Sequence, residues 1–434
     1  MADVHTFRGL RYRDDVRLDD VVAPPYDVLS AAQAAELRAR SPYNAIHVDL
    51  PVPPGAPADE EAYLRAASTF LAWREEGVLV RDELPGIVVV DQTYTGPDGR
   101  ERTRSGFVAR LRLAALDERV VLPHERTHAG PKVDRLRLYR ATHADLSTIF
   151  LLFPDDDGSV GKTLEAAAAE LPAAAWREAH DGDGNTHRCA AVAGPAAERV
   201  AGALAGRPVY IADGHHRYET ALAYRDERRA AGDPSADTLM VYLCSLSDPG
   251  LTVFPTHRLV HSIPQLSTAR LRELVAPCFD VLGEPVTGVQ SARTALEALP
   301  DQTDPAGVFG LYLPREEACL TVRAREPEAS RRLAAGGFSP AAAGLSVTLL
   351  HELLLSDALG LGHDDAERHV DYAKSVPDAL AELAGGKYEL GAFLNATRVD
   401  QVRAIADEGE VMPQKSTYFY PKLLTGLVYD ALGD

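Results

Sequence analysis

Residues 86–113 have the pattern of two strands joined by a tight turn, and this hairpin restricts the fold more than any other stretch of the chain. Alternating runs flank GPDGR at 96–100, whose glycines and proline supply the turn. Similar patterns turn at DGDGN, 181–185, and within 307–324. Because hairpin strands pair antiparallel, we exclude a doubly wound parallel sheet and predict the α+β class.

Other elements follow from periodicity and from capping residues. TIFLLF at 148–153 is typical of a buried strand, and NAIHVDL at 44–50 alternates as a strand would. Ser30 is expected to cap a helix that begins at residue 31. Residues 116–147 are expected to be rich in loops.

The length of the chain predicts two to three domains. Its 434 residues, 46% of them apolar, are enough for more than one core. Three prolines lie within 247–264, and we place the boundary there. The expected domains are residues 1–255 and residues 256–434, the second of α/β type.

No stretch of the sequence predicts a membrane span or a secretion signal. No apolar run approaches the roughly 18 residues that a span needs, and the N-terminus is charged. The cysteines are scattered without metal-binding spacing, so we expect reduced, buried thiols in a cytoplasmic protein. They are Cys189, Cys244, Cys278 and Cys319.

The formal net charge of −19 bears on the possible partners. Because an acidic surface repels the nucleic-acid backbone, we do not expect nucleic acid as a partner. An anionic substrate would need a local cationic pocket. Lysine is rare in the chain, yet Lys415 and Lys422 lie close together in MPQKSTYFYPKLLTG. A homodimer is a possible assembly of the chain.

The stretch YIADGHHRYETALAY, 210–224, is the most informative motif. An apolar run ends at Asp213 and Gly214, and helical spacing begins with His215. The start of a helix favours an anion, because its N–H groups and its dipole point outward there. Arg217 would add a planar, bidentate donor. The motif therefore predicts a phosphate site.

Two alternatives apply to the same motif. Asp213 can hold Mg²⁺ or orient a hydroxyl in a phosphate site, or it can merely cap the helix. His215 and His216 can donate hydrogen bonds to phosphate, or can be satisfied by backbone carbonyls. Zinc binding by the pair is disfavoured, because adjacent helical residues point about 100° apart.

A second polar stretch, LPHERTHAGPKVDRL at 122–136, offers a general base. Glu125 is the carboxylate best suited to the role, and Thr127 is a candidate substrate contact. The alternative is a solvated surface loop. The pattern is not that of a zincin, because His124 and His128 lie in a segment with proline and glycine.

Two further stretches supply candidate contacts. In residues 412–426 a cation precedes hydroxyl and aromatic groups, which either line the site or dock a C-terminal tail. APPYDVLS, 23–30, is a rigid turn that forms a substrate wall or a structural corner. The candidates in these stretches are Lys415, Ser416, Thr417, Tyr418, Tyr26 and Asp27.

The segment PDDDGSVGKTLE, 154–165, imitates a phosphate-binding loop. It contains Gly-Lys-Thr, but a P-loop needs glycine at 156, where the chain has Asp156 between two more aspartates. Three carboxylates would repel a triphosphate. We interpret the segment as a capped helix start.

Six stretches together resemble a bacterial and archaeal family catalogued as a domain of unknown function. They are FRGLRY, VVAPPYDV, SPYNAIHVDL, LPHERTHAGPKVDRL, YIADGHHRYETAL and MPQKSTYFYPKLLTGLV. The DGHHR element also resembles the phosphate-binding element of the ParB and sulfiredoxin fold. Within that superfamily it most resembles enzymes that phosphorylate free L-serine to O-phosphoserine.

The resemblance implies a fold and an activity. Residues 1–255 would be a ParB/sulfiredoxin-like, mixed-sheet catalytic domain with an N-terminal extension, and 256–434 a substrate-side domain that closes over the site. The activity would be a phosphotransferase, a free serine kinase that uses Mg²⁺. Its donor would be pyrophosphate or a nucleotide, ADP or ATP.

Site residues carry over motif by motif. The DGHHR element falls on Asp213 to Arg217, the acidic residue of the H-E element on Glu125, and the lysine-serine-threonine element on Lys415 to Thr417. The expected catalytic residues are Glu125, Asp213, His215 and His216, with Asp213 also the metal ligand. The expected phosphate contacts are Gly214, His215, His216, Arg217, Lys415, Ser416 and Thr417. The expected substrate contacts are Tyr26, Asp27, Thr127 and Tyr418.

Three rival functions share these residues. A ParB-like protein would bind or hydrolyse a nucleotide and act with DNA as a switch or a nuclease, which the acidic charge of the chain disfavours. A metal-dependent phosphate-ester hydrolase would use water as the acceptor in place of serine. A binding module would hold the ligand without turnover.

Overall fold

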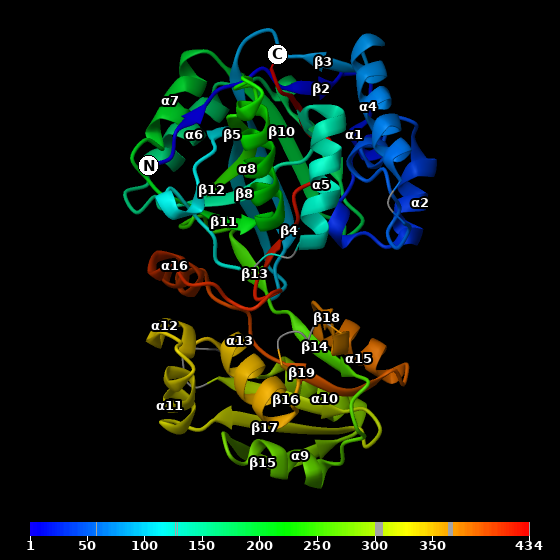
Figure 1. The fold of residues 1–434 in the computed structure, drawn as a ribbon, viewed down its shortest axis with the longest axis vertical. Coiled ribbons are helices and arrows are strands. Elements are labelled where there is room, and N and C mark those ends of the chain that lie inside the picture. The colour runs from blue at the N-terminus through cyan, green and yellow to red at the C-terminus, as the bar shows by residue number, and fades with distance from the viewer. Residues whose placement is uncertain (58, 126, 128, 300–306, 363–367, 434) are drawn as a thin grey trace. The chain divides into compact units, whose positions relative to one another are not determined.

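The computed structural model describes residues 1–57, 59–125, 127, 129–299, 307–362 and 368–433. The chain divides into two compact units (Figure 1). Unit 1 comprises Met1–Pro123, Thr127–Thr252 and Pro421–Asp434, and unit 2 comprises His124–Arg126 and Val253–Tyr420. We predicted a second domain over 256–434. The chain instead returns to unit 1 at Pro421, because its last segment pairs there with residues of unit 1.

Unit 1 is built on a mixed sheet. Among the described residues its nine strands follow the order β6-β11-β8-β12-β5-β4-β10-β9, with β1 also on β5. The β11–β6 and β12–β8 pairs are parallel and the others antiparallel. The strands are β1 (Val4–His5), β4 (Gly86–Thr95), β5 (Glu101–Arg112), β6 (Val121–Leu122), β8 (Ile149–Phe153), β9 (Arg177–His180), β10 (Thr186–Ala193), β11 (Val209–Asp213) and β12 (Thr238–Ser245). The hairpins predicted at 96–100 and 181–185 are confirmed.

Alternation along the strands gives this sheet two buried faces. The pair Val89 and Phe107 faces a core shared with α6, α7 and α8. The next pair, Val88 and Val108, faces the other way, and Val108 lies beside Leu424 of the C-terminal segment. The helices of unit 1 are α1 (Leu18–Val21), α2 (Ala31–Arg40), α3 (Ile46–Asp49), α4 (Glu60–Glu75), α5 (Ala129–Thr142), α6 (Ser159–Ala169), α7 (Pro195–Ala203) and α8 (His215–Ala230).

Short elements complete unit 1. Two small antiparallel pairs join distant segments, and one of them binds the C-terminal segment to the strand that follows α5. The elements are β2 (Leu10–Tyr12) with β3 (Leu79–Arg81), β7 (Ala144–Asp145) with β21 (Asp430–Ala431), and the 3-10 turns η1 (Tyr26–Val28), η2 (Leu116–Glu118) and η3 (Ala173–Ala175).

The interpretation of the Gly-Lys-Thr segment as a capped helix start is confirmed. The carboxylate of Asp155 accepts hydrogen bonds from the backbone N–H groups of Val160 and Gly161, at 3.1 and 2.8 Å. An aspartate that caps the first turn of α6 occupies the position where a phosphate would otherwise bind. Arg207 lies 3.4 Å from the same carboxylate and balances its charge.

Two predictions about secondary structure are wrong. Residues 44–50 are not a strand but contain α3, because the Asn44 side chain accepts from Ile46 N at 3.1 Å and ties the turn to two carbonyls. Residues 116–147 are not loop-rich throughout, because α5 packs against α4 and α8. Figure 1 shows α5 and α8 side by side. In both segments tertiary packing outweighs a weak local pattern.

Unit 2 contains a separate antiparallel sheet. Its order among the described residues is β15-β17-β16-β19-β14-β18, and the predicted hairpin at 307–324 is confirmed. The strands are β14 (His257–His261), β15 (Phe279–Thr287), β16 (Val308–Leu313), β17 (Ala318–Ala324), β18 (Val370–Ala373) and β19 (Tyr388–Phe393). A further pair joins β13 (Thr252–Phe254) and β20 (Tyr418–Tyr420).

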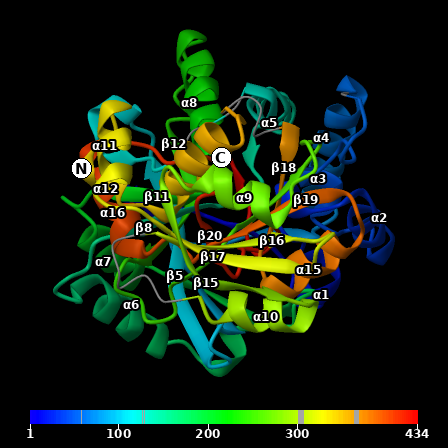
Figure 2. The ribbon, with the colours of Figure 1, turned by 90° about the horizontal axis from the view of Figure 1, so that it is seen from below.

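Helices cover both faces of this sheet. Leu311 and Leu320 face one core, and the neighbouring pair Tyr312 and Cys319 faces the other. Figure 2 shows α10 and α15, which belong to the second core, close together. The helices are α9 (Thr268–Val275), α10 (Val289–Glu297), α11 (Glu328–Ala335), α12 (Pro340–Ala343), α13 (Ser346–Leu349), the π-helix η4 (Leu350–Ala358), α15 (Val376–Ala384) and α16 (Val399–Glu408).

Two predictions from composition can be compared with the structure. All four cysteines are unpaired and buried, as expected. Across the described ranges, no helix is both long and apolar enough to cross a bilayer.

Candidate functional site

The DGHHR motif forms a strand, a tight turn and a helix, as predicted. β11 ends at Asp213, Gly214 has a left-handed φ of 95°, and α8 begins at His215. The first helical bond joins Tyr218 N to Gly214 O at 3.0 Å. Amides at the N-terminal end of a helix attract an anion. We call this feature, Asp213 to Arg217, the α8 turn.

Gly214 is required by its conformation and by its neighbour. A Cβ at this position would lie 3.1 Å from Arg217 Nη2 and 3.2 Å from both Cζ and Nε. The guanidinium therefore packs directly against the glycine backbone. A side chain here would be strained and would push Arg217 away.

This geometry gives a testable prediction for Gly214→Ala. We expect a loss of stability of about 1–3 kcal/mol and a larger relative loss of anion affinity, since the substitution strains φ and displaces Arg217. Thermal unfolding and titration with pyrophosphate measure the two effects. Gly182→Ala is the matched control, because Gly182 has ordinary φ and no atom within 4 Å of its Cβ position. Equal behaviour of the two variants would contradict the account.

Arg217 is buried beneath the turn, only 6% exposed. Its Nη1 donates to Thr148 O at 2.7 Å and lies 3.4 Å from Ser147 Oγ, and its Nη2 donates to Asp213 Oδ2 at 3.3 Å. Burial alone would lower the pKa of Arg217, but Asp213 and other nearby carboxylates outweigh it and raise that pKa. In this arrangement Arg217 fixes the turn and orients Asp213. Its direct contact with phosphate stays a prediction.

Asp213 is held between two cations. Its Oδ1 accepts from Lys422 Nζ at 3.2 Å, while Oδ2 faces Arg217. Lys422 is partly exposed at 15%, so its ammonium can reach an incoming anion. The sequence predicts Lys415 as a phosphate contact and does not single out Lys422 as one. The signal was present, since both are rare lysines in one motif.

The predicted Mg²⁺ ligand is Asp213, and its surroundings test that role. Magnesium is usually bound by one or two carboxylates together with substrate phosphates. A metal ion at Asp213 would have to displace Lys422 or Arg217. Within the described part of the chain no group of three or more His, Cys, Asp or Glu side chains could hold a metal. The arrangement as it stands does not fit a resident Mg²⁺, and the assignment stays a prediction.

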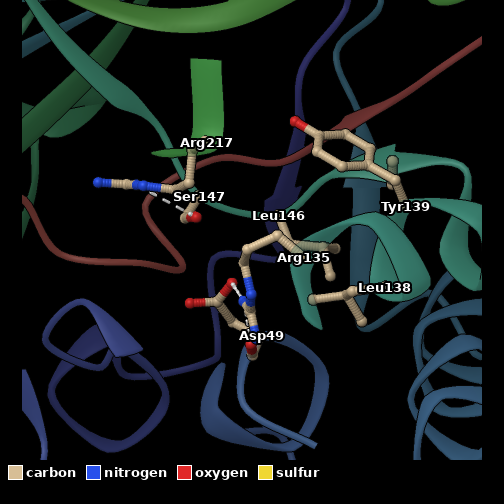
Figure 3. Close-up of a pocket in the computed structure, with 8 residues that line it drawn as sticks. Asp49, Arg135, Leu138, Tyr139, Leu146, Ser147 and Arg217 are labelled. Atoms are coloured by element: carbon tan, nitrogen blue, oxygen red, sulfur yellow. Dashed lines mark hydrogen bonds and ion pairs between the residues drawn. The ribbon is translucent and has the colours of Figure 1, made fainter. Parts of the chain in front are cut away.

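A second arginine lies beside the turn in unit 1. Arg135 donates to Asp49 O at 2.6 Å and lies 3.2 Å from Asp49 Oδ1. Both residues line a small cavity of about 20 Å³ together with Ser147 and Arg217. Figure 3 shows these side chains. That volume holds about one water molecule. Burial raises the pKa of Asp49, and the two arginines oppose the rise.

The APPYDV turn reaches the same neighbourhood. The Arg135 guanidinium lies 4.0 Å from the centre of the Tyr26 ring, and burial raises the pKa of Tyr26 to about 12. The negative charge of Asp27 acts on Arg217 and helps to raise its pKa. The structure therefore brings Tyr26 and the exposed Asp27 near the α8 turn, and their role as a substrate wall stays a prediction.

Thr127 is tied to α8 by a residue that the sequence analysis missed. Its hydroxyl donates to the carboxylate of Glu219 at 2.9 Å, and Lys132 pairs with the same carboxylate. Glu219 lies one helical turn beyond His215. Of the two motif histidines, His215 is buried and His216 is half-buried. His128 lies outside the described residues.

The H-E and lysine-serine-threonine motifs meet in unit 2. Glu125 Oε1 accepts from Lys415 N at 2.8 Å, Met412 N donates to His124 O at 2.8 Å, and His124 Nε2 lies 2.9 Å from Thr417 Oγ1. Lys415 itself has a left-handed φ of 55°. Glu125 thus holds the Lys415 backbone, and its role as a general base stays a prediction.

The remaining residues of this cluster make structural contacts. Ser416 is buried and its hydroxyl donates to Pro413 O, while its own carbonyl accepts from Thr397 at 3.0 Å. Tyr418 accepts from Lys374 Nζ at 2.8 Å. These contacts are those of a docked segment, the alternative that the sequence analysis left open, and the predicted ligand contacts of Ser416 and Tyr418 stay predictions.

Comparison with family models identifies the chain. The model described as "Protein of unknown function (DUF1015)" matches residues 4–347. The chain therefore belongs to the DUF1015 family, and the family resemblance inferred from its motifs is confirmed. No curated protein matches the sequence significantly.

Solved structures show only a loose similarity. One is a conserved hypothetical protein from Pyrococcus furiosus, at 13% identity and a TM-score of 0.31, over 69% of this chain and 87% of that one. Another is a free serine kinase variant in complex with AMP, at 12% identity and a TM-score of 0.34, over 69% and 84%. A variant with ADP aligns equally well. Superpositions this loose carry no argument about the site.

Proposed function

We propose that this protein is a small-molecule kinase that transfers a phosphoryl group to the hydroxyl of free L-serine and forms O-phosphoserine. We infer that the mixed sheet of unit 1 is ParB/sulfiredoxin-like and that unit 1 is the catalytic part. One observation carries the proposal: Lys422 and Arg217 flank Asp213 at the positive end of α8. In a chain of net charge −19, such a local cationic corner is what an anionic donor needs.

Phosphoryl transfer demands positioning and charge stabilisation more than covalent work by the protein. On donor binding, the Lys422 ammonium would turn from Asp213 to the phosphate, and the amides of the α8 turn would bind its oxygens. Asp213, held by Arg217, would then orient the serine hydroxyl. Arg217 acts in this scheme as a positioning residue.

The chemical step is a displacement at phosphorus. Serine Oγ forms a bond to the terminal phosphorus of the donor, the bridging P–O bond breaks, and the leaving phosphate or nucleotide keeps that electron pair. The hydroxyl proton passes to a carboxylate. Glu125 is the base that the family resemblance implies. Mg²⁺ would arrive bound to the donor phosphates rather than reside at Asp213.

Phosphorus NMR tests the proposal directly. The protein is mixed with Mg²⁺, serine and, in turn, pyrophosphate, ADP or ATP. We expect a phosphomonoester signal that depends on serine with one of these donors. Phosphate release at the same rate with and without serine would favour the hydrolase, and ligand binding without turnover would favour the binding module. A shift of DNA on a gel at low salt would favour the ParB-like alternative.

A further inference from the structure

Two aspartates face each other in the interior of unit 1. Asp145 on β7 and Asp430 on β21 are directly opposed partners in an antiparallel bridge, and each is 1% exposed. Two buried carboxyl groups side by side cannot both ionise without a large cost, so such pairs share one proton. The pair lies outside the site described above.

The neighbours of the pair decide which member keeps the charge. Arg110 on β5 binds Asp430 through two parallel bonds, Nε to Oδ2 and Nη2 to Oδ1, each 2.6 Å. Such a fork stabilises a carboxylate. Asp145 instead accepts from Tyr139 OH on α5 at 2.6 Å and from Met240 N on β12 at 2.8 Å. These two neutral donors stabilise a carboxylate less than the guanidinium of Arg110 does, so Asp145 is the member of the pair that takes the proton.

The energetics agree with this assignment. Burial, and then the charge of Asp430, raise the pKa of Asp145 from 3.8 to about 7. The folded protein thus retains a proton that the unfolded chain releases near its ordinary pKa. The stability that this proton supplies is complete at low pH and is lost as the pH rises through about 7.

The β21 strand belongs to the segment that supplies Lys422. Within residues 421–433, Lys422 contacts Asp213, the Tyr429 hydroxyl lies 2.9 Å from that of Tyr12, and Leu432 N donates to His143 O at 3.0 Å. We call residues 421–433 the C-terminal strap. One end of the strap meets the α8 turn, and the other is held by β7.

We propose that Asp145 and Asp430 form a proton-operated latch that docks the C-terminal strap and so sets the position of Lys422. With Asp145 protonated the strap is closed. With both carboxylates ionised, Arg110 balances only one of them, and the β7–β21 pairing loosens. The effect on donor binding rests on the proposed function, whereas the docking of the strap does not.

Hydrogen exchange followed by mass spectrometry tests the latch without any ligand. Protection factors of peptides from residues 421–433 are compared at about pH 6 and about pH 8.5, after correction for the intrinsic exchange rate. We expect protection in the wild type to fall about tenfold, because the lower pH lies about one unit below the pKa of Asp145 and the higher pH lies above it. Peptides from β15 and β17, which belong to the separate sheet of unit 2, should not change.

Two variants sharpen the test. Asp145→Asn cannot ionise, so its strap should stay equally protected at both pH values. Tyr139→Phe removes a hydrogen bond that lowers the pKa of Asp145, so its loss of protection should move to higher pH. If Asp145→Asn does not fold, the Tyr139→Phe variant still tests the latch. A wild type with constant protection, an Asp145→Asn protein with the same loss, or a Tyr139→Phe midpoint that stays in place would overturn the latch.

A binding arm separates this proposal from the proposed function. Pyrophosphate itself titrates in this pH range, and the Asp145→Asn variant measures that contribution to the change in affinity. Beyond it, the affinity of the wild type for pyrophosphate should fall by about a further tenfold. If pyrophosphate binds at neither pH while protection still depends on pH, the kinase proposal fails and the latch stands. If pyrophosphate binds but both proteins lose affinity equally, the coupling to Lys422 is overturned.

Discussion

Replacing Lys422 with alanine will lower kcat/KM for the phosphate donor by about 100-fold, because removal of one well-aimed donor costs this much in related charge-stabilising sites. Stability should change little, since the ammonium is partly exposed and Asp213 keeps Arg217 as its partner. Steady-state kinetics and thermal unfolding, measured on the same preparation, separate the two effects.

Lys162 offers the matched control for this lysine. It is an exposed lysine on α6 of the same unit, next to the segment that imitates a P-loop. Lys162→Ala should retain the activity of the wild type. If Lys162→Ala lost activity and Lys422→Ala did not, the phosphate site would belong at the start of α6, and the α8 turn would be structural.

Arg217→Ala will combine a loss of activity of about 100-fold or more with a loss of stability of about 3 kcal/mol. The activity falls because Asp213 and the turn lose the group that orients them, and misplacement by about 1 Å has effects of this size. The stability falls because the buried Asp49 and the half-buried Asp213 lose a nearby cation. The measurements are kcat at a temperature well below unfolding and the denaturation midpoint.

Two substitutions show whether this effect belongs to the site. Arg217→Lys keeps the charge but not the fork that reaches Thr148 O and Asp213 together, so it should recover stability more than activity. Arg228→Ala removes a more exposed arginine from the last turn of the same helix and should be nearly silent. An Arg217→Ala enzyme with most of its activity would remove Arg217 from the mechanism.

The local structure of the site was predictable from residue order. A short apolar run, Asp-Gly and a helical period predict a strand, a turn and a helix, and each of these depends only on neighbours in the chain. The capped start of α6 was predictable for the same reason, since three adjacent carboxylates exclude a phosphate loop, whereas the structure shows that Asp155 is the capping residue.

The partners of the site were harder to predict. Lys415 and Lys422 are seven positions apart, yet Lys415 lies with Glu125 in unit 2 and Lys422 with Asp213 in unit 1. They belong to different units because the chain passes from unit 2 to unit 1 between Tyr420 and Pro421, and the sequence does not show where this change occurs. The helices α3 and α5 were missed because the packing that stabilises them comes from distant parts of the chain.

The central claim is that the α8 turn with Lys422 binds a phosphoryl group, and a crystal structure with pyrophosphate and Mg²⁺ tests it most directly. The account predicts an anion at hydrogen-bond distance from the first amides of α8, with Lys422 turned from Asp213 toward it. A structure in which pyrophosphate binds elsewhere, while Lys422 and Arg217 still pair with Asp213 over an empty turn, would contradict it.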